Sequence, residues 1–377
     1  MREHNTERTT YIGLDAHKRR HRVAVLLPGE KTFEEWEIPN EARSIKRMVK
    51  KVIKMGPRGV CFCYEAGPCG YALQRQIEGL GAKCVVVAPS LVPVKPGERI
   101  KTDRRDARKL AKMLASGLLT EVRAPTREEE SVRDLCRCRE DVREDLTRNR
   151  HRMSKFLLRR GMIYPKGKNW TKRHRAWLRS LSFEDRSSQV TFEQYLIGIE
   201  QLEERLRGVE AEIETLAQSE RYQEAVGWLC CFRGIKTITA MTLLSELHDF
   251  RRFHSARELM AYLGLVPSED SSGDRRRRGS ITKTGNRHVR RVLVETGWHY
   301  RHLPTVGIDL RRRREGQPGS VISLAEKAQN RLHRRFWYLC NKGKSPNKAV
   351  VAVARELVGF IWSVLAVQGQ DKEATGS

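Results

Sequence analysis

The chain has 377 residues, enough for two or three domains with cores of their own. A hydrophobic content of 39% excludes a disordered chain, and no apolar run approaches the roughly 20 residues of a membrane span. The net charge of +27, from 73 Lys and Arg against 46 Asp and Glu, exceeds what solubility needs and favours a nucleic-acid partner over other classes.

The first part of the chain, residues 9–125, is typical of an α/β domain. Runs of β-branched and aromatic residues predict strands, and amphipathic stretches predict helices between them. The expected strands lie near 11–18, 21–27, 32–38, 59–67 and 83–90, and the expected helices cover 41–55, 71–81 and a segment that begins near 103. Three strands followed by alternating helix and strand predict a mixed sheet covered by helices.

The middle region, residues 126–220, is predicted to be helical and elongated. Its apolar residues recur at alternating steps of three and four, the pattern of a coiled-coil seam, at Phe192, Tyr195, Ile199, Leu202, Leu206, Val209, Ile213 and Leu216. Two interpretations stay open: a seam between two chains, or an intramolecular hairpin in which 192–216 packs on 131–160. The segment from Arg148 to Arg160 has six basic residues and no acid, which fits either a solvated face or a phosphate contact.

The last region, residues 221–377, is predicted to be mainly helical and very basic. A Gly-Ile turn within 232–236 precedes a helix whose N-terminus can hold a phosphate, although that signal is weak alone. Residues 271–291 are expected to be a polar loop with eight Lys or Arg against one Asp, and the run from 311 to 319 a mobile basic loop. Residues 348–365 predict a buried terminal helix.

Four carboxylates of the first region stand in suggestive places. Asp15 lies within the first predicted strand and Glu65 ends the fourth, while Asp103 and Asp106 are one helical turn apart at a helix start. Carboxylate oxygens are preferred ligands of Mg²⁺, and two such ions about 4 Å apart can stabilise both oxygens of a phosphodiester exchange. The four acids therefore predict a metal centre that acts on nucleic acid.

A structural role competes with this interpretation. Asp103 and Asp106 alone are more often a helix start that complements the positive end of the helix dipole, with Thr102 as the cap. Asp15 and Glu65 are harder to explain in that way, because an acid among apolar strand residues is costly to bury unless it is paired or bound to metal. His17, at a strand end, is interpreted as a surface histidine.

Several segments of the sequence resemble those of a known family. The segments YIGLDAHK, CYEAGPCGYALQRQIEGLGAKCVVVAPS and KTDRRDARKLAKML are similar to the N-terminal RuvC-like domain of DEDD insertion-sequence transposases, the bridge-RNA-guided recombinases. The segment that begins FRGIKTITAMTLLSEL and runs through SSGDRRRRGSITKTGNRHVRR resembles the C-terminal transposase domain of that family. The resemblance covers nearly the whole chain in the same order.

The resemblance implies an RNase H/RuvC-like mixed-sheet domain (9–125), a helical coiled-coil middle (126–220) and a mainly α-helical C-terminal transposase domain (221–377). It implies that the metal-binding tetrad is Asp15, Glu65, Asp103 and Asp106, holding Mg²⁺ or, as the alternative, Mn²⁺. The nucleophile would be Ser272, with Ser271 as the second choice. The family often has a second glycine where this chain has Asp274.

The implied reaction has Ser272 attack a DNA phosphodiester to form a phosphoserine link, after which a hydroxyl of the other DNA completes strand exchange. The implied partners are donor DNA, target DNA, a structured guide RNA and further copies of the chain, as a dimer that assembles to a tetramer. In the family, the metal domain of one subunit meets the serine domain of another.

The implied setting is the bacterial or archaeal cytoplasm, at the nucleoid, with no membrane. None of the nine cysteines forms a CxxC pair, so a zinc module or a disulfide framework is not supported, which fits a reducing compartment. Two rival functions remain: a RuvC-like junction resolvase or nuclease that uses water, and a non-catalytic nucleic-acid-binding protein.

Overall fold

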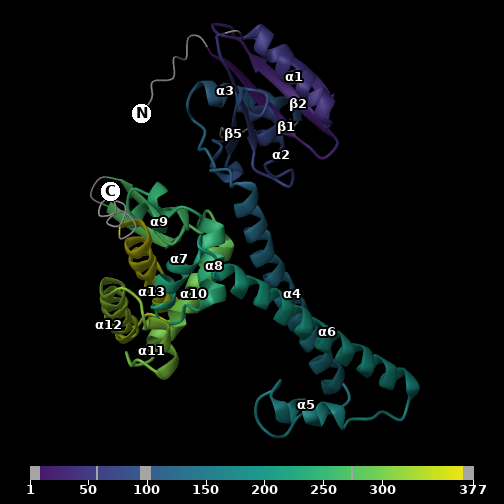
Figure 1. Ribbon diagram of the computed structural model, residues 1–377, viewed down its shortest axis with the longest axis vertical. Coiled ribbons are helices and arrows are strands. Elements are labelled where there is room, and N and C mark those ends of the chain that lie inside the picture. Colours follow the sequence, from purple (N-terminus) through teal and green to yellow (C-terminus); the bar gives the residue numbers. More distant parts are fainter. Residues whose placement is uncertain (1–8, 57, 94–102, 273–274, 368–377) are drawn as a thin grey trace. The chain divides into compact units, whose positions relative to one another are not determined.

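The computed structural model describes residues 9–56, 58–93, 103–272 and 275–367. The chain divides into two compact units, residues 1–126 and 127–377, and each is described by itself. The first unit is α/β and the second is almost entirely helical (Figure 1). The expected boundary between the middle and C-terminal regions, near residue 220, falls within the second unit and stays a prediction.

The first unit is built on a five-stranded mixed sheet in the order β3-β2-β1-β4-β5. The first three strands pair antiparallel, whereas β1, β4 and β5 are parallel. This order is compatible with the expected RNase H-like sheet. Its elements are β1 (Thr10–Ala16), β2 (Arg20–Leu26), β3 (Glu34–Pro39), α1 (Ala42–Met55), β4 (Val60–Glu65), α2 (Ala72–Glu78), β5 (Lys83–Val87), η1 (Pro89–Leu91) and α3 (Asp103–Ala115).

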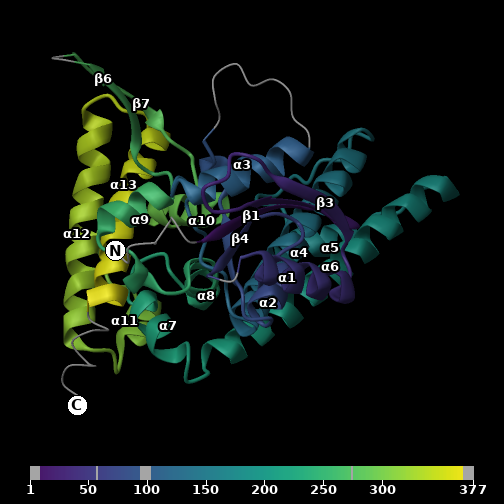
Figure 2. The same ribbon diagram turned by 90° about the horizontal axis from the view of Figure 1, so that it is seen from above.

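The two faces of the sheet carry different helices. On one face, alternate residues such as Ile12, Leu14 and Phe62 pack against α1 and α2. On the other face, Tyr11 and Cys63 pack against Leu110 of α3. Figure 2 shows α3 on the opposite side of the sheet from α1 and α2. Since strand side chains alternate between faces, Asp15 and Glu65 share the face of α3.

The second unit begins with a long helical hairpin. Helices α4 (Arg127–Leu158) and α6 (Arg186–Ala217) lie side by side, and α5 (Lys172–Arg179) lies near the turn between them (Figure 1). We call these three helices the arm. The apolar seam of α6 packs on α4 of the same chain, with Phe192, Ile199 and Leu202 buried among α4 residues such as Leu146 and Met153. Of the two sequence interpretations, the intramolecular hairpin is therefore the one that accounts for these contacts.

The rest of the second unit is a helical core around α13. Its elements are α7 (Gln223–Cys230), α8 (Thr237–Leu247), η2 (Phe250–Arg252), α9 (Ala256–Tyr262), β6 (Pro267–Ser272), β7 (Arg275–Ile281), α10 (Arg287–Gly297), η3 (Trp298–Arg301), α11 (Ile308–Arg314), α12 (Gly319–Asn341), α13 (Pro346–Trp362) and η4 (Ser363–Val367). Helix α13 with its extension to Ala366 is apolar and long enough to cross a membrane by composition. It packs against α9, α10 and α12, which is the behaviour expected of a core helix.

Two expected loops of the C-terminal region were wrong. Residues 267–272 and 275–281 form the antiparallel strand pair β6–β7, in which the register sets Asp270 opposite Arg277, and opposite charges across a strand pair are favourable. Residues 308–314 form α11. The end of this basic run packs inside the protein, where Arg314 is buried. Its guanidinium donates to the carbonyl of Cys231 and to the carboxylate of Glu326.

Candidate active site

The candidate site lies where β1 ends under the start of α3. Asp15 lies on β1 two residues after Gly13, so both residues lie on the face of the sheet that α3 covers. A side chain at Gly13 is excluded by the helix, because a methyl group there would lie 2.6 Å from the backbone nitrogen of Ala111. The missing side chain lets the backbone of α3 approach the strand, and this contact brings the first turn of the helix over Asp15.

A pair of arginines holds α3 on the sheet. Arg104 and Arg108 both contact Glu35 of β3, whose side chain is 7% exposed. The Nε of Arg104 lies 2.6 Å from Glu35 Oε2, and Arg108 donates through Nε (2.5 Å) and Nη2 (2.6 Å). Hydrogen bonds from Arg108 outweigh burial and hold the pKa of Glu35 below its usual value. These two cations are therefore engaged by the fold, which leaves them less suited to phosphate contacts.

Asp15, His17 and Asp103 form a cluster. One ligand atom from each lies within 4.8 Å of the others. The His17 Nε2 is 3.0 Å from Asp15 Oδ2 and 3.8 Å from Asp103 Oδ2. Asp15 is the least exposed of the three at 19%, against 72% for Asp103. The arrangement offers two carboxylates and an imidazole to a cation from three directions.

The charges around Asp15 favour a positively charged ligand. Its pKa is raised, first by burial and then by the nearby charges of Asp103 and Asp106, while His17 acts in the opposite direction. Within the described residues, no lysine or arginine forms an ion pair with Asp15 or Asp103. A divalent ion would relieve this repulsion, and carboxylate oxygens are its preferred ligands. The residues present therefore fit a divalent cation.

The other two predicted ligands lie nearby by position in the fold. Asp106 is one turn after Asp103 on α3, on the same helix face. Glu65 ends β4 one residue beyond the last pair of the parallel ladder, Leu14 with Tyr64, and so stands beside Asp15 on the adjacent strand. The assignment of all four acids as metal ligands stays a prediction.

The predicted nucleophile is only partly described. Ser272 is the last residue of β6 and pairs with Arg275 across the hairpin. Its side chain, that of Ser271, and residues 273–274, which include Asp274, lie outside what the structure describes, as does Thr102, the expected helix cap. The role of Ser272 as the nucleophile therefore stays a prediction.

His17 lies in the cluster, although the sequence alone favours a surface histidine outside the site. Its side chain is exposed, as that interpretation expects. The signal that could have found it is its position two residues after Asp15, just past the end of β1, where the chain turns back across the carboxyl end of the strand. With the ring 56% exposed, it lines the open side of the cluster.

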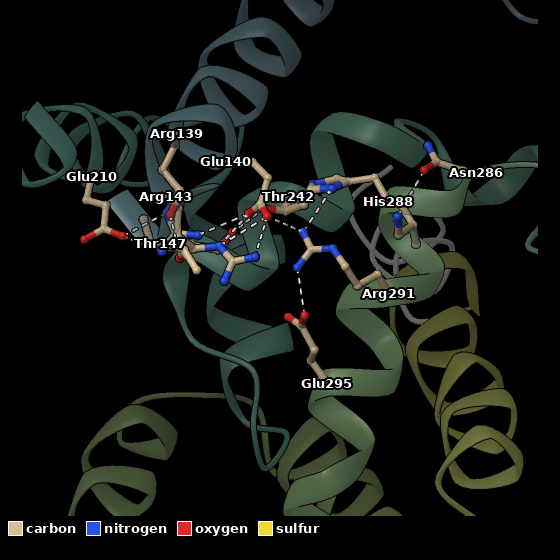
Figure 3. Close-up of polar contacts among 12 residues, drawn as sticks. Arg139, Glu140, Arg143, Thr147, Glu210, Thr242, Asn286, His288, Arg291 and Glu295 are labelled. Atoms are coloured by element: carbon tan, nitrogen blue, oxygen red, sulfur yellow. Dashed lines mark hydrogen bonds and ion pairs between the residues drawn. The ribbon is translucent and has the colours of Figure 1, made fainter. Parts of the chain in front are cut away.

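A second group of acids lies in the second unit, between the arm and the helical core. Glu140 of α4 accepts from Arg143, at 2.5 Å, and lies 2.7 Å from an Nη of Arg291 of α10, which also contacts Glu295 (Figure 3). Nearby, Glu246 of α8 is paired with Arg137 through two contacts of 2.6 and 2.9 Å. These acids join α4 to α8 and α10.

The start of α10 belongs to the same network. Asn286 accepts from the backbone N–H of Val289 and so caps α10, and its amide donates to Glu246 over 2.6 Å. The hairpin β6–β7 ends five residues before this cap, at Ile281. The base of the hairpin is thereby tied to the arm through Glu246.

Comparisons with known proteins agree with this architecture. A family model for DEDD transposases of IS110 elements matches residues 12–161, and one described as the transposase IS116/IS110/IS902 family matches residues 228–305. A putative transposase of Sinorhizobium fredii, y4qE, is 39% identical over 95% of this chain and 88% of its own length. The transposase for insertion sequence element IS1533 of Leptospira borgpetersenii is 37% identical over 90% and 99%, respectively.

The acidic edge of a mixed sheet and a basic helical unit, together with these matches, define a DNA transposase, an enzyme of recombination. The chain belongs to the IS116/IS110/IS902 family of insertion-sequence transposases.

Proposed function

We propose that this transposase cleaves donor and target DNA and exchanges their strands through a metal-binding acidic site and a serine nucleophile. The first unit would be an RNase H/RuvC-like domain. The observation that carries the proposal is the cluster of Asp15, His17 and Asp103, with ligand atoms within 4.8 Å, at the carboxyl end of β1. Family membership supports divalent metal use.

The acids would hold Mg²⁺ or Mn²⁺ through Asp15, Asp103, Asp106 and Glu65. A bound ion would polarise the scissile phosphate and stabilise the leaving oxygen. The close approach at Gly13 and the pairing of Glu35 with Arg104 and Arg108 support this proposal, because they fix α3, which carries Asp103 and Asp106, against the sheet.

Ser272 would carry the covalent step. Its hydroxyl oxygen bonds to the phosphorus as the bond to the departing DNA oxygen breaks, the serine proton is lost, and the departing oxygen takes up a proton. A hydroxyl of the second DNA then attacks the phosphoserine, which restores the serine. The position of Ser272 at the end of a two-stranded hairpin supports this role, because a projecting hairpin can present a side chain to DNA.

The remaining parts of the proposal concern partners. A structured guide RNA would select the target by base pairing, and the acidic site of one chain would work with the serine of another in a dimer or tetramer. The seam of α6 is already covered by α4, so association would use other surfaces. The working compartment would be the cytoplasm.

The test uses the full chain with donor DNA, target DNA, the transcript that flanks the element, and Mg²⁺. The parent is expected to give recombinants and a covalent protein–DNA adduct. Asp15→Asn keeps the shape of the side chain and should lower recombination at least about 100-fold, because the site loses the charge that draws the cation. Ser272→Ala should remove the adduct, with Ser271→Ala as the matched control.

Three outcomes would contradict parts of this proposal. Full recombination by both serine variants would exclude a serine nucleophile at this hairpin. Cleavage to free ends with no adduct would favour a nuclease that uses water. Equal activity without the transcript would exclude RNA guidance.

A further inference from the structure

The far part of the arm carries a strongly one-sided charge. From residue 148 to 183 the sequence has 12 Lys and Arg and no Asp or Glu. A solvated helical surface ordinarily mixes both signs, because like charges repel one another. The structure divides these 12 cations into two groups with different surroundings.

Five of the cations have partners inside the arm or near it. Arg150 and Arg175 both contact Glu203 of α6, which ties α5 to the two long helices. The others contact acids, a hydroxyl or a backbone carbonyl: Arg148 with Asp145, Arg179 with Glu200, and Arg160 with Ser188 and the carbonyl of Phe156. These five stabilise the arm and are not free for a ligand.

The other seven cations are exposed, and within the described residues none has an ion pair or hydrogen bond from its side chain. They are Arg152, Lys155, Arg159, Lys166, Lys168, Lys172 and Arg173. All fall within residues 152–173, which we call the arm tip. Arg152 and Lys155 are three residues apart on α4 and so share one face of that helix, and Arg159 follows directly after its end.

The arm tip is held in shape by an aromatic cluster. The ring of buried His174 lies between Tyr164, at 4.9 Å, and Trp170, at 5.2 Å, with Trp177 packed against Tyr164 at 5.3 Å. Thr171 caps α5 by accepting from the backbone N–H of His174. Lys166 and Lys168 lie between the two anchored aromatic residues, Tyr164 and Trp170. The segment that carries them is thereby anchored at both ends without a ligand, which lowers the entropy lost on binding.

We propose that the arm tip binds the phosphate backbone of nucleic acid, as a contact separate from the acidic site. Exposed lysines and arginines that bind phosphates supply affinity but do not read sequence. Arg137, which contacts the helical core, precedes the end of α4 at Leu158 by about 21 residues, so the arm tip lies roughly 30 Å along the helix from that contact. Phosphates bound at the arm tip would therefore hold a nucleic acid at a distance from the core helices.

The test measures binding of the full chain to a fluorescent duplex DNA of unrelated sequence, and to a duplex RNA of the same sequence, over a series of salt concentrations. The first variant is Lys166→Gln/Lys168→Gln/Lys172→Gln and the second is Arg152→Gln/Lys155→Gln/Arg159→Gln. A matched control, Lys342→Gln/Lys344→Gln/Lys348→Gln, removes three exposed lysines around the turn between α12 and α13.

Each arm-tip variant should weaken binding about tenfold or more and lower the slope of log affinity against log salt by about 2 to 3, since each phosphate contact contributes about 0.9. The control should change both quantities by less than half as much. A Lys166→Arg/Lys168→Arg/Lys172→Arg variant should keep parental binding. Thermal unfolding should be unchanged, because these side chains contribute no ion pairs.

A loss on only one of the two duplexes would support the proposal and identify the nucleic acid. Parental affinity and salt slope in both arm-tip variants, on both duplexes, would overturn it. So would an equal loss in the control, because the effect would then follow net charge rather than the arm tip.

Discussion

The two units each bring acidic side chains close together, but with opposite electrostatic results. At the edge of the sheet, the neighbours of Asp15 include Asp103 and Asp106, and the pKa of Asp15 is raised by burial and by those charges. At the junction of the arm and the helical core, Glu246 is buried more deeply, at 2% exposure, yet its pKa is lowered. Burial acts to raise this pKa too, but Arg137, the hydrogen bond from Asn286 and the charge of His288 together outweigh burial.

The difference separates structural acids from functional ones. The charge of an acid that folds against an arginine is balanced without any ligand, and removal of one partner of such a pair destabilises the protein. An acid that folds against other acids costs stability at neutral pH, which a cation can restore. On this criterion Glu140 and Glu246 belong to the scaffold, whereas Asp15 has the properties expected of the proposed site.

The largest effect is expected from Gly13→Ala. The added methyl group overlaps the backbone of α3, so the helix must move away from β1 and carry Asp103 and Asp106 with it. Overpacking of this kind costs about 3 kcal/mol of unfolding free energy. Urea unfolding and Mn²⁺ titration should both show the loss. Gly208→Ala on α6, where no atom lies within 4 Å of the new methyl, should instead stabilise by about 0.5 to 1 kcal/mol.

The next effect contrasts the two acids directly. Glu246→Gln should lower the free energy of unfolding by about 2 kcal/mol at pH 7, less than for a fully buried pair because Arg137 is half exposed. Asp15→Asn should not lower it, because a carboxylate with a raised pKa is destabilising when ionised. A loss of stability in Asp15→Asn equal to that in Glu246→Gln would remove the distinction between the sites.

The free energy of unfolding should also depend on pH differently in the parent and in Glu246→Gln. Because the folded pKa of Glu246 lies below its ordinary value of 4.5, its contribution is complete above about pH 4.5 and is lost as the pH falls through the lower folded pKa. The parent should therefore lose more stability than Glu246→Gln between pH 5 and pH 3, as measured by thermal unfolding. Parallel acid limbs in the two proteins would contradict this assignment.

The smallest effect is expected from His17→Gln. The ring is 56% exposed and its contact with Asp103 is long, so its loss should weaken Mn²⁺ binding by less than about tenfold and leave most recombination activity. His254→Gln is a matched control, because His254 is an exposed histidine beside a single acid, Glu258. An effect as large as that of Asp15→Asn would make His17 a required ligand.

The sheet was predictable because local sequence determines it. The apolar runs around Ile12, Val23 and Phe62 are strands in any context that buries them, and the predicted positions of β1 to β5 differ from the observed ones mainly at the ends. The grouping of Asp103 with Asp15 was expected from the four acids taken together and from the family resemblance, because Asp103 and Asp106 alone more often mark a helix start. The contribution of Gly13 was not expected, because a glycine in a strand gives no sign of which helix will cross it.

The second unit was less predictable because the partners of its residues are distant in the sequence. Arg314 looks like part of a solvated basic run, but it is buried through contacts with Cys231 and Glu326. The seam of α6 looks the same whether α4 of its own chain or another copy covers it. Arg314 is separated from Cys231 by 83 residues and from Glu326 by 12, and α6 packs on a helix that comes earlier in the chain. The periodicity of a sequence cannot show which of these distant partners is used.

Because α4 is one continuous helix, its length also determines the direction in which its basic residues face. Helices α4 and α6 have 32 residues each, or about 48 Å, and Arg152 and Lys155 keep a fixed angle to Arg137 through unbroken helix. One inserted residue in α4 would turn that basic face by about 100° and break the seam, whereas seven residues in both helices would restore the alignment and extend the arm by about 10 Å. Natural variation in arm length should therefore come in matched steps of seven.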